Sequence, residues 1–217
     1  MTAPPLVLVM EKTYLSRLAQ VNNTAHRSPK EIVSRCMKTV VEMLHDRGYG
    51  EIQTCQSADQ VLRNMTDGRS VLQATKSDGE QIRVFFHNED RVGVKQLRAW
   101  TEGGAGDKII IVSLDGPTSF TRKEAEEKYP NVAFFTFRDL CVNITRHTLV
   151  PLHERISASE MPFEIKHNQD ELPVLYTTDK VAQYYDFQPN DIVRITRTAG
   201  VQEPIHYYRL VRLPSSS

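Results

Sequence analysis

The chain has 217 residues, 40% of them hydrophobic and 25% charged, which is typical of a globular protein with one large domain or two modest ones. Its 27 basic and 27 acidic residues cancel, and neither half is basic, which argues against a free-standing nucleic-acid-binding protein that neutralises phosphates. Three widely spaced cysteines argue against a disulfide framework or a zinc site. The apolar run at residues 6–10 is too short for a signal peptide or a membrane span.

The first firm helical pattern begins at Ser28, after an extension over residues 1–27 in which only a short helix around residues 11–20 is indicated. Ser28 and Glu31 have the spacing of a capping box, and Pro29 occupies the first helical position. Arg47 and Gly48 end the helix, the glycine being suited to left-handed geometry. An apolar stripe at helical spacing lies between these ends: Ile32, Val33, Cys36, Met37, Val40, Val41 and Leu44. We therefore predict a helix with one buried face.

Strand and helix signals then alternate up to residue 137. The Asp-Gly pair within Ser77–Glu80 is a hairpin signal. The β-branched run Ile109–Val112 is typical of a strand that is buried on both faces. The expected helices cover 58–65, 94–101 and 121–128, and the expected strands cover 71–75, 82–86, 109–112 and 132–137. This alternation predicts an α/β domain with a mixed sheet over residues 28–142.

The pattern changes after the segment Asn143–His153. A helix begins in 157–162 and is expected to stop at Pro162, since proline breaks a helix interior. A second short helix is predicted over 178–185 with a threonine cap. Strands are predicted over 192–196 and 205–211. We interpret residues 143–217 as a small α+β domain.

The run His206–Arg212 combines aromatic and basic residues, so base stacking is one reading. On a strand the run alternates, and a core face plus an interface face explains it more simply. His147 and His153 have no partner at zinc-ligand spacing. We expect no catalytic residue, no metal and no cofactor.

These pieces, in this order, resemble a known family, the small subunit shared by the nuclear RNA polymerases I, II and III. The C-terminal part of that family is similar to a small subunit of the archaeal RNA polymerase. Four stretches carry the resemblance: 45–49, 84–86 with 92–95, 143–153, and 190–195 with 207–211. They span most of the chain, so the resemblance is more specific than any single motif.

The resemblance implies an N-terminal domain similar to restriction-endonuclease-like folds, which projects as a jaw near downstream DNA, and a C-terminal polymerase-assembly domain. It implies a non-catalytic structural subunit anchored on the largest polymerase subunit, with other subunits as further partners and DNA met only within the assembly. No membrane and no small-molecule substrate are expected. The implied location is the nucleus, or the nucleolus for a subunit specific to RNA polymerase I.

Eight residues are the candidate partner-binding set. Five come from the segment between the domains and three from the C-terminal sheet. They are Ile144, His147, Leu149, Val150, Pro151, Arg194, Tyr208 and Leu210. A permanent interface needs an apolar, aromatic-rich centre, which these residues supply.

The chain departs from the family in one helix, which usually reads Asp-Pro-Val-Ala-Arg-Tyr followed by an aromatic residue and glycine. Here the stretch Asp179–Asp186 has lysine in place of the proline and aspartate in place of the glycine. The N-terminal extension is also longer. These departures favour a diverged paralogue that serves one polymerase class.

Two alternatives stay open. The first is a metal-dependent nuclease, because the family's N-terminal domain resembles the fold of such enzymes. Those enzymes place a carboxylate two residues before a lysine, whereas this chain has Gly93 before Lys95, with Asp78, Glu80, Glu89 and Asp90 nearby. The second is an adaptor protein outside transcription.

Overall fold

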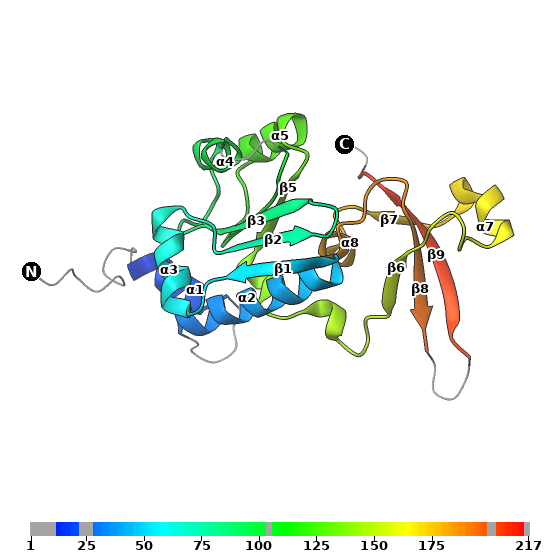
Figure 1. Ribbon diagram of the computed structural model, residues 1–217, viewed down its shortest axis with the longest axis horizontal. Coiled ribbons are helices and arrows are strands. Elements are labelled where there is room, and N and C mark those ends of the chain that lie inside the picture. Colours follow the sequence, from blue (N-terminus) through cyan, green and yellow to red (C-terminus); the bar gives the residue numbers. More distant parts are fainter. Residues whose placement is uncertain (1–11, 22–27, 103–105, 199–202, 215–217) are drawn as a thin grey trace, which may run out of the picture. The chain divides into compact units, whose positions relative to one another are not determined.

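The computed structural model describes residues 12–21, 28–102, 106–198 and 203–214. The chain forms two compact units, and the boundary falls between Val142 and Asn143. Each unit has its own mixed sheet and its own core (Figure 1). None of the helices among the described residues is long and apolar enough to span a membrane.

The N-terminal unit is built on a five-stranded sheet in the order β1-β2-β3-β4-β5. The first three strands pair antiparallel, and β3, β4 and β5 pair parallel, which confirms the mixed sheet. The predicted hairpin joins β2 to β3, with Gly79 at φ 90°. The strands are β1 (Tyr49–Thr54), β2 (Leu72–Lys76), β3 (Gln81–Phe86), β4 (Lys108–Ser113) and β5 (Val132–Thr136).

Helices cover both faces of this sheet (Figure 1). The helices are α1 (Lys12–Ala19), α2 (Pro29–Asp46), α3 (Ala58–Asp67), α4 (Val94–Thr101), α5 (Ser119–Lys128) and α6 (Phe137–Leu140). An apolar cluster fills the space between the sheet and helices α4 and α5. In this cluster Phe85 stacks on Trp100, with ring centroids 5.1 Å apart. Towards α6, Phe86 meets Phe137 edge to face. All four residues of Ile109–Val112 are buried, as expected for a strand covered on both sides.

The long helix α2 has the predicted ends. The Ser28 Oγ accepts a hydrogen bond from the Glu31 backbone N–H at 3.3 Å, and Pro29 is the first helical residue. Gly48 follows the helix at φ 87°. Every residue of the predicted apolar stripe except Val41 is buried. Local capping and periodicity therefore account for this element.

Helix α1, the described part of the N-terminal extension, is fixed to the loops that follow β3 and β4. The Tyr14 hydroxyl donates a buried hydrogen bond of 2.7 Å to the carbonyl of His87. Arg17 bridges Asp90 and Asp115, and its hydrogen bond to Asp115 is 2.9 Å long. Leu18 is completely buried. The extension thus contributes a packed helix to this unit.

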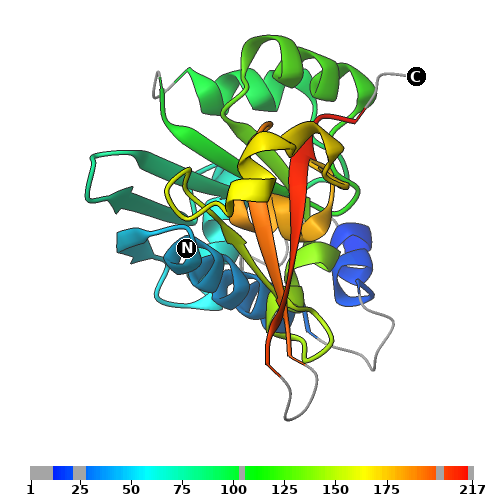
Figure 2. The ribbon, with the colours of Figure 1, turned by 90° about the vertical axis from the view of Figure 1, so that its right-hand side faces the viewer.

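The C-terminal unit has a four-stranded sheet in the order β6-β8-β9-β7. Strand β7 pairs parallel with β9, and the other pairs are antiparallel. Figure 2 shows β8 (orange) and β9 (red) running side by side. The elements are β6 (Leu152–Arg155), β7 (Val174–Tyr176), β8 (Ile192–Arg197), β9 (Ile205–Arg212), α7 (Phe163–His167), α8 (Lys180–Tyr185) and the 3-10 turns η2 (Ile144–Arg146) and η3 (Gln169–Glu171).

Both faces of this small sheet carry an apolar cluster. Ala182 of α8 packs with Val193 and Val211 on one face. Ile165 of α7 packs against Ile192 and Leu210 on the other. Helices α7 and α8 have five and six residues and so extend only about 8–9 Å. Strand β9 has eight residues and is about 26 Å long, so its loop end reaches beyond both helices.

Two local predictions for this unit are wrong. Residues 157–161 form a turn instead of a helix, and Pro162 precedes α7 as its N-cap residue instead of ending a helix. Proline is well tolerated at a helix start, where no backbone donor is lost. The cap of α8 is Asp179, whose carboxylate accepts hydrogen bonds from the N–H groups of Val181 and Ala182. An aspartate accepts these bonds at least as well as threonine.

Candidate functional site

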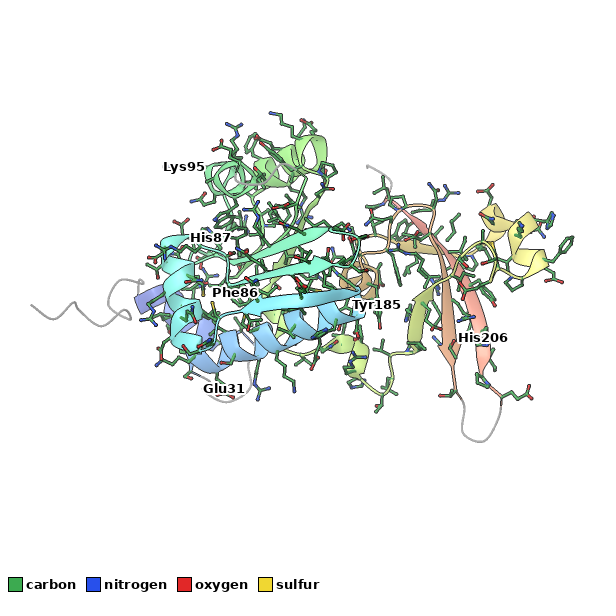
Figure 3. All side chains as sticks on the ribbon, viewed as in Figure 1. Glu31, Phe86, His87, Lys95, Tyr185 and His206 are labelled. Carbon is green, nitrogen blue, oxygen red and sulfur yellow. The ribbon has the colours of Figure 1, made fainter. Side chains whose placement is uncertain are left out.

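The carboxylates of the nuclease alternative do not converge. Asp78 and Glu80 lie in the turn before β3, whereas Glu89 and Asp90 follow the strand. Six residues of β3 separate the two pairs by about 20 Å. Lys95 lies in the first turn of α4 and is exposed (Figure 3). The described residues contain no group of three His, Cys, Asp or Glu side chains that could hold a metal ion.

Glu80 is held by an ion-pair network. Its carboxylate accepts hydrogen bonds of 2.6 Å from both the Lys76 ammonium and the Tyr49 hydroxyl, and Lys108 lies 3.4 Å away. Burial alone would raise the pKa of Glu80, but these hydrogen bonds and nearby positive charges lower it to about 2. Glu80 therefore links β1, β2 and β4. The comparison with nucleases receives no support from this geometry.

The segment that opens the C-terminal unit is an ordered loop. The Asn143 side-chain amide donates a 3.0 Å hydrogen bond to the Tyr184 hydroxyl on α8. The His147 ring nitrogen Nδ1 accepts a hydrogen bond from the Leu149 backbone N–H at 3.2 Å, and the His147 carbonyl accepts one from Val150 at 2.9 Å. The candidate residue His147 thus shapes the loop through its own hydrogen bonds.

Apolar side chains of this loop face outward. Leu149 is 84% exposed and Leu152, the first residue of β6, is 53% exposed. Ile144, Val150 and Pro151 are half-buried. Exposed apolar side chains grouped over a short stretch are typical of protein-interaction surfaces. Ile144, Leu149, Val150 and Pro151 are the apolar loop residues of the candidate set, and Leu152 lies directly beside them.

The sheet residues of the candidate set separate into two kinds. Arg194 and Tyr208 are directly opposite in the β8–β9 register, so they share one face, and Arg194 pairs with Glu154 at 3.1 Å. Leu210 is only 4% exposed and packs in the core of its own unit with Ile192. Leu210 therefore offers no surface to a partner, and its selection as a contact residue is corrected.

The predicted division of β9 into a core face and an interface face is also corrected. Leu210 and Val211 are both buried although they point to opposite faces. Near the other end Ile205 is 47% and Tyr207 49% exposed, and the neighbouring His206 is visible near the loop (Figure 3). The short helices cover only one part of β9. Whether a side chain of β9 is exposed therefore depends on its place along the strand. The sequence pattern alone did not identify Ile205 and Tyr207 as candidates.

His153, the second residue of β6, has a pKa below the ordinary histidine value. Burial lowers the pKa of His153, and the charges of Arg209 and Arg197 lower it further, against opposing effects of the Pro151 carbonyl and Asp179. The His153 Nδ1 lies 2.8 Å from the Pro151 carbonyl. This contact links the His153 ring to the loop before β6.

Comparison with known proteins places both units in one family. A family model described as RNA polymerase Rpb5, N-terminal domain, matches residues 33–103. A second, RNA polymerase Rpb5, C-terminal domain, matches residues 142–211. The second match begins at the boundary between the units and includes the exposed loop.

Individual relatives agree. The protein named DNA-directed RNA polymerases I, II, and III subunit RPABC1 from Caenorhabditis briggsae is 30% identical over 200 residues, which cover 82% of this chain and 94% of the relative. Its counterpart in Caenorhabditis elegans has the same identity and coverage. The Dictyostelium discoideum protein is 29% identical over 186 residues, covering 80% of this chain and 93% of the relative. The chain belongs to the RNA polymerase Rpb5 family.

Proposed function

We propose that this chain is a non-catalytic structural subunit of a nuclear DNA-directed RNA polymerase. The observation that carries the proposal is the family match in both units, together with relatives that are aligned over most of their length and are named as polymerase subunits. The proposed location of the protein is the nucleus. Its partners are the largest subunit and other subunits of the enzyme.

The C-terminal unit is the anchor in this proposal. Its loop supplies Leu149, Val150 and Pro151, and its sheet supplies Arg194 and Tyr208, which share one face and are both half-buried. Such a set combines apolar and aromatic side chains with an arginine, the composition found at the centres of stable interfaces. A permanent interface would bury the apolar side chains that the isolated chain leaves in water.

The N-terminal unit serves as the jaw in this proposal, with a restriction-endonuclease-like fold, near downstream DNA. Support comes from its architecture, a mixed five-stranded sheet with helices on both faces, and from the resemblance to the family. The whole chain has zero net charge, so attraction to DNA would come from the complete enzyme.

The chain is further proposed to serve only one class of nuclear RNA polymerase. Lys180 opens α8 where the family has proline, and Asp186 stands where the family has glycine. Asp186 adopts φ 56°, the left-handed conformation that glycine favours, so an aspartate here occupies a position suited to glycine. The changed side chains therefore alter the surface of α8.

Purification of the tagged full-length chain from its own cells tests the proposal. We expect the largest subunit of one polymerase class to be recovered in stoichiometric amounts, and imaging to place the chain in the nucleus, or in the nucleolus for RNA polymerase I. Recovery of all three classes would overturn the class specificity alone. Recovery of only non-polymerase proteins would overturn the function.

A further inference from the structure

Two exposed arginines of the C-terminal sheet differ from three other arginines of the unit in having no carboxylate partner among the described residues. Neither Arg197 nor Arg209 has a carboxylate within salt-bridge distance among residues 143–198 and 203–214, and Arg209 bonds only to the backbone carbonyl of Val174. Three other arginines of the unit each pair with a carboxylate at 2.8–3.1 Å: Arg155 with Asp191, Arg194 with Glu154, and Arg212 with Asp170. Two guanidinium groups are thus available for a partner.

The two arginines lie on one face of the β8–β9 pair. Arg197 is opposite Ile205, and Arg209 is opposite Val193, so all four side chains point to the same face. Tyr207 lies between Ile205 and Arg209 on that face, and the Arg197 guanidinium is 5.6 Å from the centre of its ring. We call Arg197, Ile205, Tyr207 and Arg209 the arginine–tyrosine face.

His153 is the neighbouring titratable group on this side of the sheet. His153 on β6 is opposite Ile195, which places it on the same side of the sheet. Burial is the first cause of its lowered pKa, and the positive charges of Arg209 and Arg197 both add to the effect. The two guanidinium groups therefore act on one region, and Asp179 is the acidic group that opposes them.

The composition of the face is that of an interface centre. Ile205 and Tyr207 are each about half exposed, and both arginines are exposed. Arginine and tyrosine are enriched among the residues that dominate binding energies, and an unpaired arginine favours a carboxylate in a bidentate geometry. The face lies on the side of the sheet opposite to Arg194 and Tyr208, so it is a second surface of the unit.

We propose that the arginine–tyrosine face binds an extended polypeptide segment of another polymerase subunit, with carboxylates on either side of an apolar residue. The proposal rests on the proposed function. Arg209 is opposite Val193 of β8, and Arg197 lies four residues further along that strand. Four residues of a strand span about 13 Å. Two acidic residues about four positions apart on an extended chain match this spacing, with an apolar side chain against Ile205 and Tyr207 between them.

A nucleic acid is the less suitable occupant. Single-stranded bases stack on exposed aromatic faces, but Arg197 already lies over the ring of Tyr207. The exposed apolar side chain of Ile205 also has no role in phosphate binding. The charge and the apolar surface together favour an acidic peptide segment.

The test uses the tagged full-length chain in cells. A chain with Arg197→Glu and Arg209→Glu is expected to recover at least tenfold less polymerase at physiological salt than the wild type, with an unchanged melting temperature. Arg197→Lys with Arg209→Lys, which keeps both charges, is expected to retain more binding than the charge reversal. Lys123→Glu, an exposed change on α5, is the matched control and is expected to behave as the wild type.

The outcomes separate this inference from the function on which it rests. A wild-type chain that recovers no polymerase subunit overturns the proposed function. If the wild-type chain recovers polymerase and the charge-reversed chain recovers as much of it across a salt series, the inference alone is overturned. A photo-crosslinking amino acid at position 207 in the assembled enzyme is expected to capture an acidic segment of another subunit. Capture of nucleic acid, or of a segment without carboxylates, contradicts the inference.

Discussion

Replacing Leu149 by aspartate is expected to release the chain from polymerase without unfolding it. The side chain is 84% exposed in the loop that opens the C-terminal unit, and the hydrogen bond of Leu149 to His147 comes from the backbone, which the substitution retains. Exposed substitutions that break no specific contact usually change the free energy of unfolding by less than about 0.5 kcal/mol. We therefore expect the melting temperature of Leu149→Asp to remain that of the wild type.

The effect on assembly is much larger if the loop is an interface. Burying a leucine side chain contributes about 1.5–3 kcal/mol, and each 1.4 kcal/mol is about tenfold in affinity. Losing this contribution alone weakens binding roughly tenfold to a hundredfold, and burying an unpaired carboxylate adds to the loss. Leu149→Ala removes most of the apolar contact without the charge, so its effect is expected to lie between those of the wild type and Leu149→Asp.

Co-purification of polymerase subunits, with thermal unfolding of the purified chain, measures both effects. The matched control is Phe120→Asp on α5, because Phe120 is 82% exposed but lies in the N-terminal unit. We expect Phe120→Asp to be incorporated normally. Normal incorporation of Leu149→Asp would refute the role of the loop, and a clear fall in its melting temperature would refute the argument that the side chain is free in the isolated chain.

Three further predictions concern the chain itself. Tyr14→Phe removes a buried hydrogen bond to the carbonyl at the end of β3 and is expected to lower the free energy of unfolding by about 1 kcal/mol in urea denaturation. The folded-state pKa of Glu80 is lowered to about 2, so its contribution to stability is complete above the ordinary glutamate pKa and is lost as the pH falls towards 2; Glu80→Gln is expected to flatten the acid limb of the stability curve between those values. Cys55 is partly exposed whereas Cys36 and Cys141 are buried, so a thiol reagent is expected to modify Cys55 first and the other two only after denaturation. Fast modification of all three in the native chain would contradict the packing of α2 against α6.

Elements with local signals were predictable from the sequence. Helix α4 has its predicted bounds, Val94–Thr101, because a glycine precedes it and its apolar residues follow helical spacing. The buried strand β4 was recognised from its β-branched run, since no other arrangement suits four consecutive apolar residues of that kind so well. In both cases the information lies within about ten residues of the element.

Three strands escaped prediction because other strands determine them. Strand β1 (Tyr49–Thr54) is mostly exposed and has no apolar alternation, so only its pairing with β2 makes it a strand. The short edge strands β6 and β7 similarly depend on β8 and β9. Edge strands of this kind need few apolar residues, and sequence periodicity therefore carries little information about them.

The exposure of the candidate residues was predictable from the sequence only in part, and their role in binding a partner stays a prediction. The segment that opens the C-terminal unit was identified by its change of composition, and Leu149 in it is indeed exposed. Leu210 was selected from alternation alone, which assumes that a sheet is covered on one face. The faces of this sheet are covered by the two short helices α7 and α8, so the part near the loop between β8 and β9 is open on both sides.

The bridges made by helix α1 have a consequence for how the chain is synthesised. Tyr14 bonds to a residue 73 positions later, and Arg17 to Asp115, 98 positions later. The ribosome releases α1 first, yet its binding loops are translated only when the first half of the chain is complete. These bridges can therefore form only after β3 and β4 have been translated, and premature termination before residue 115 would leave Arg17 without its bond to Asp115.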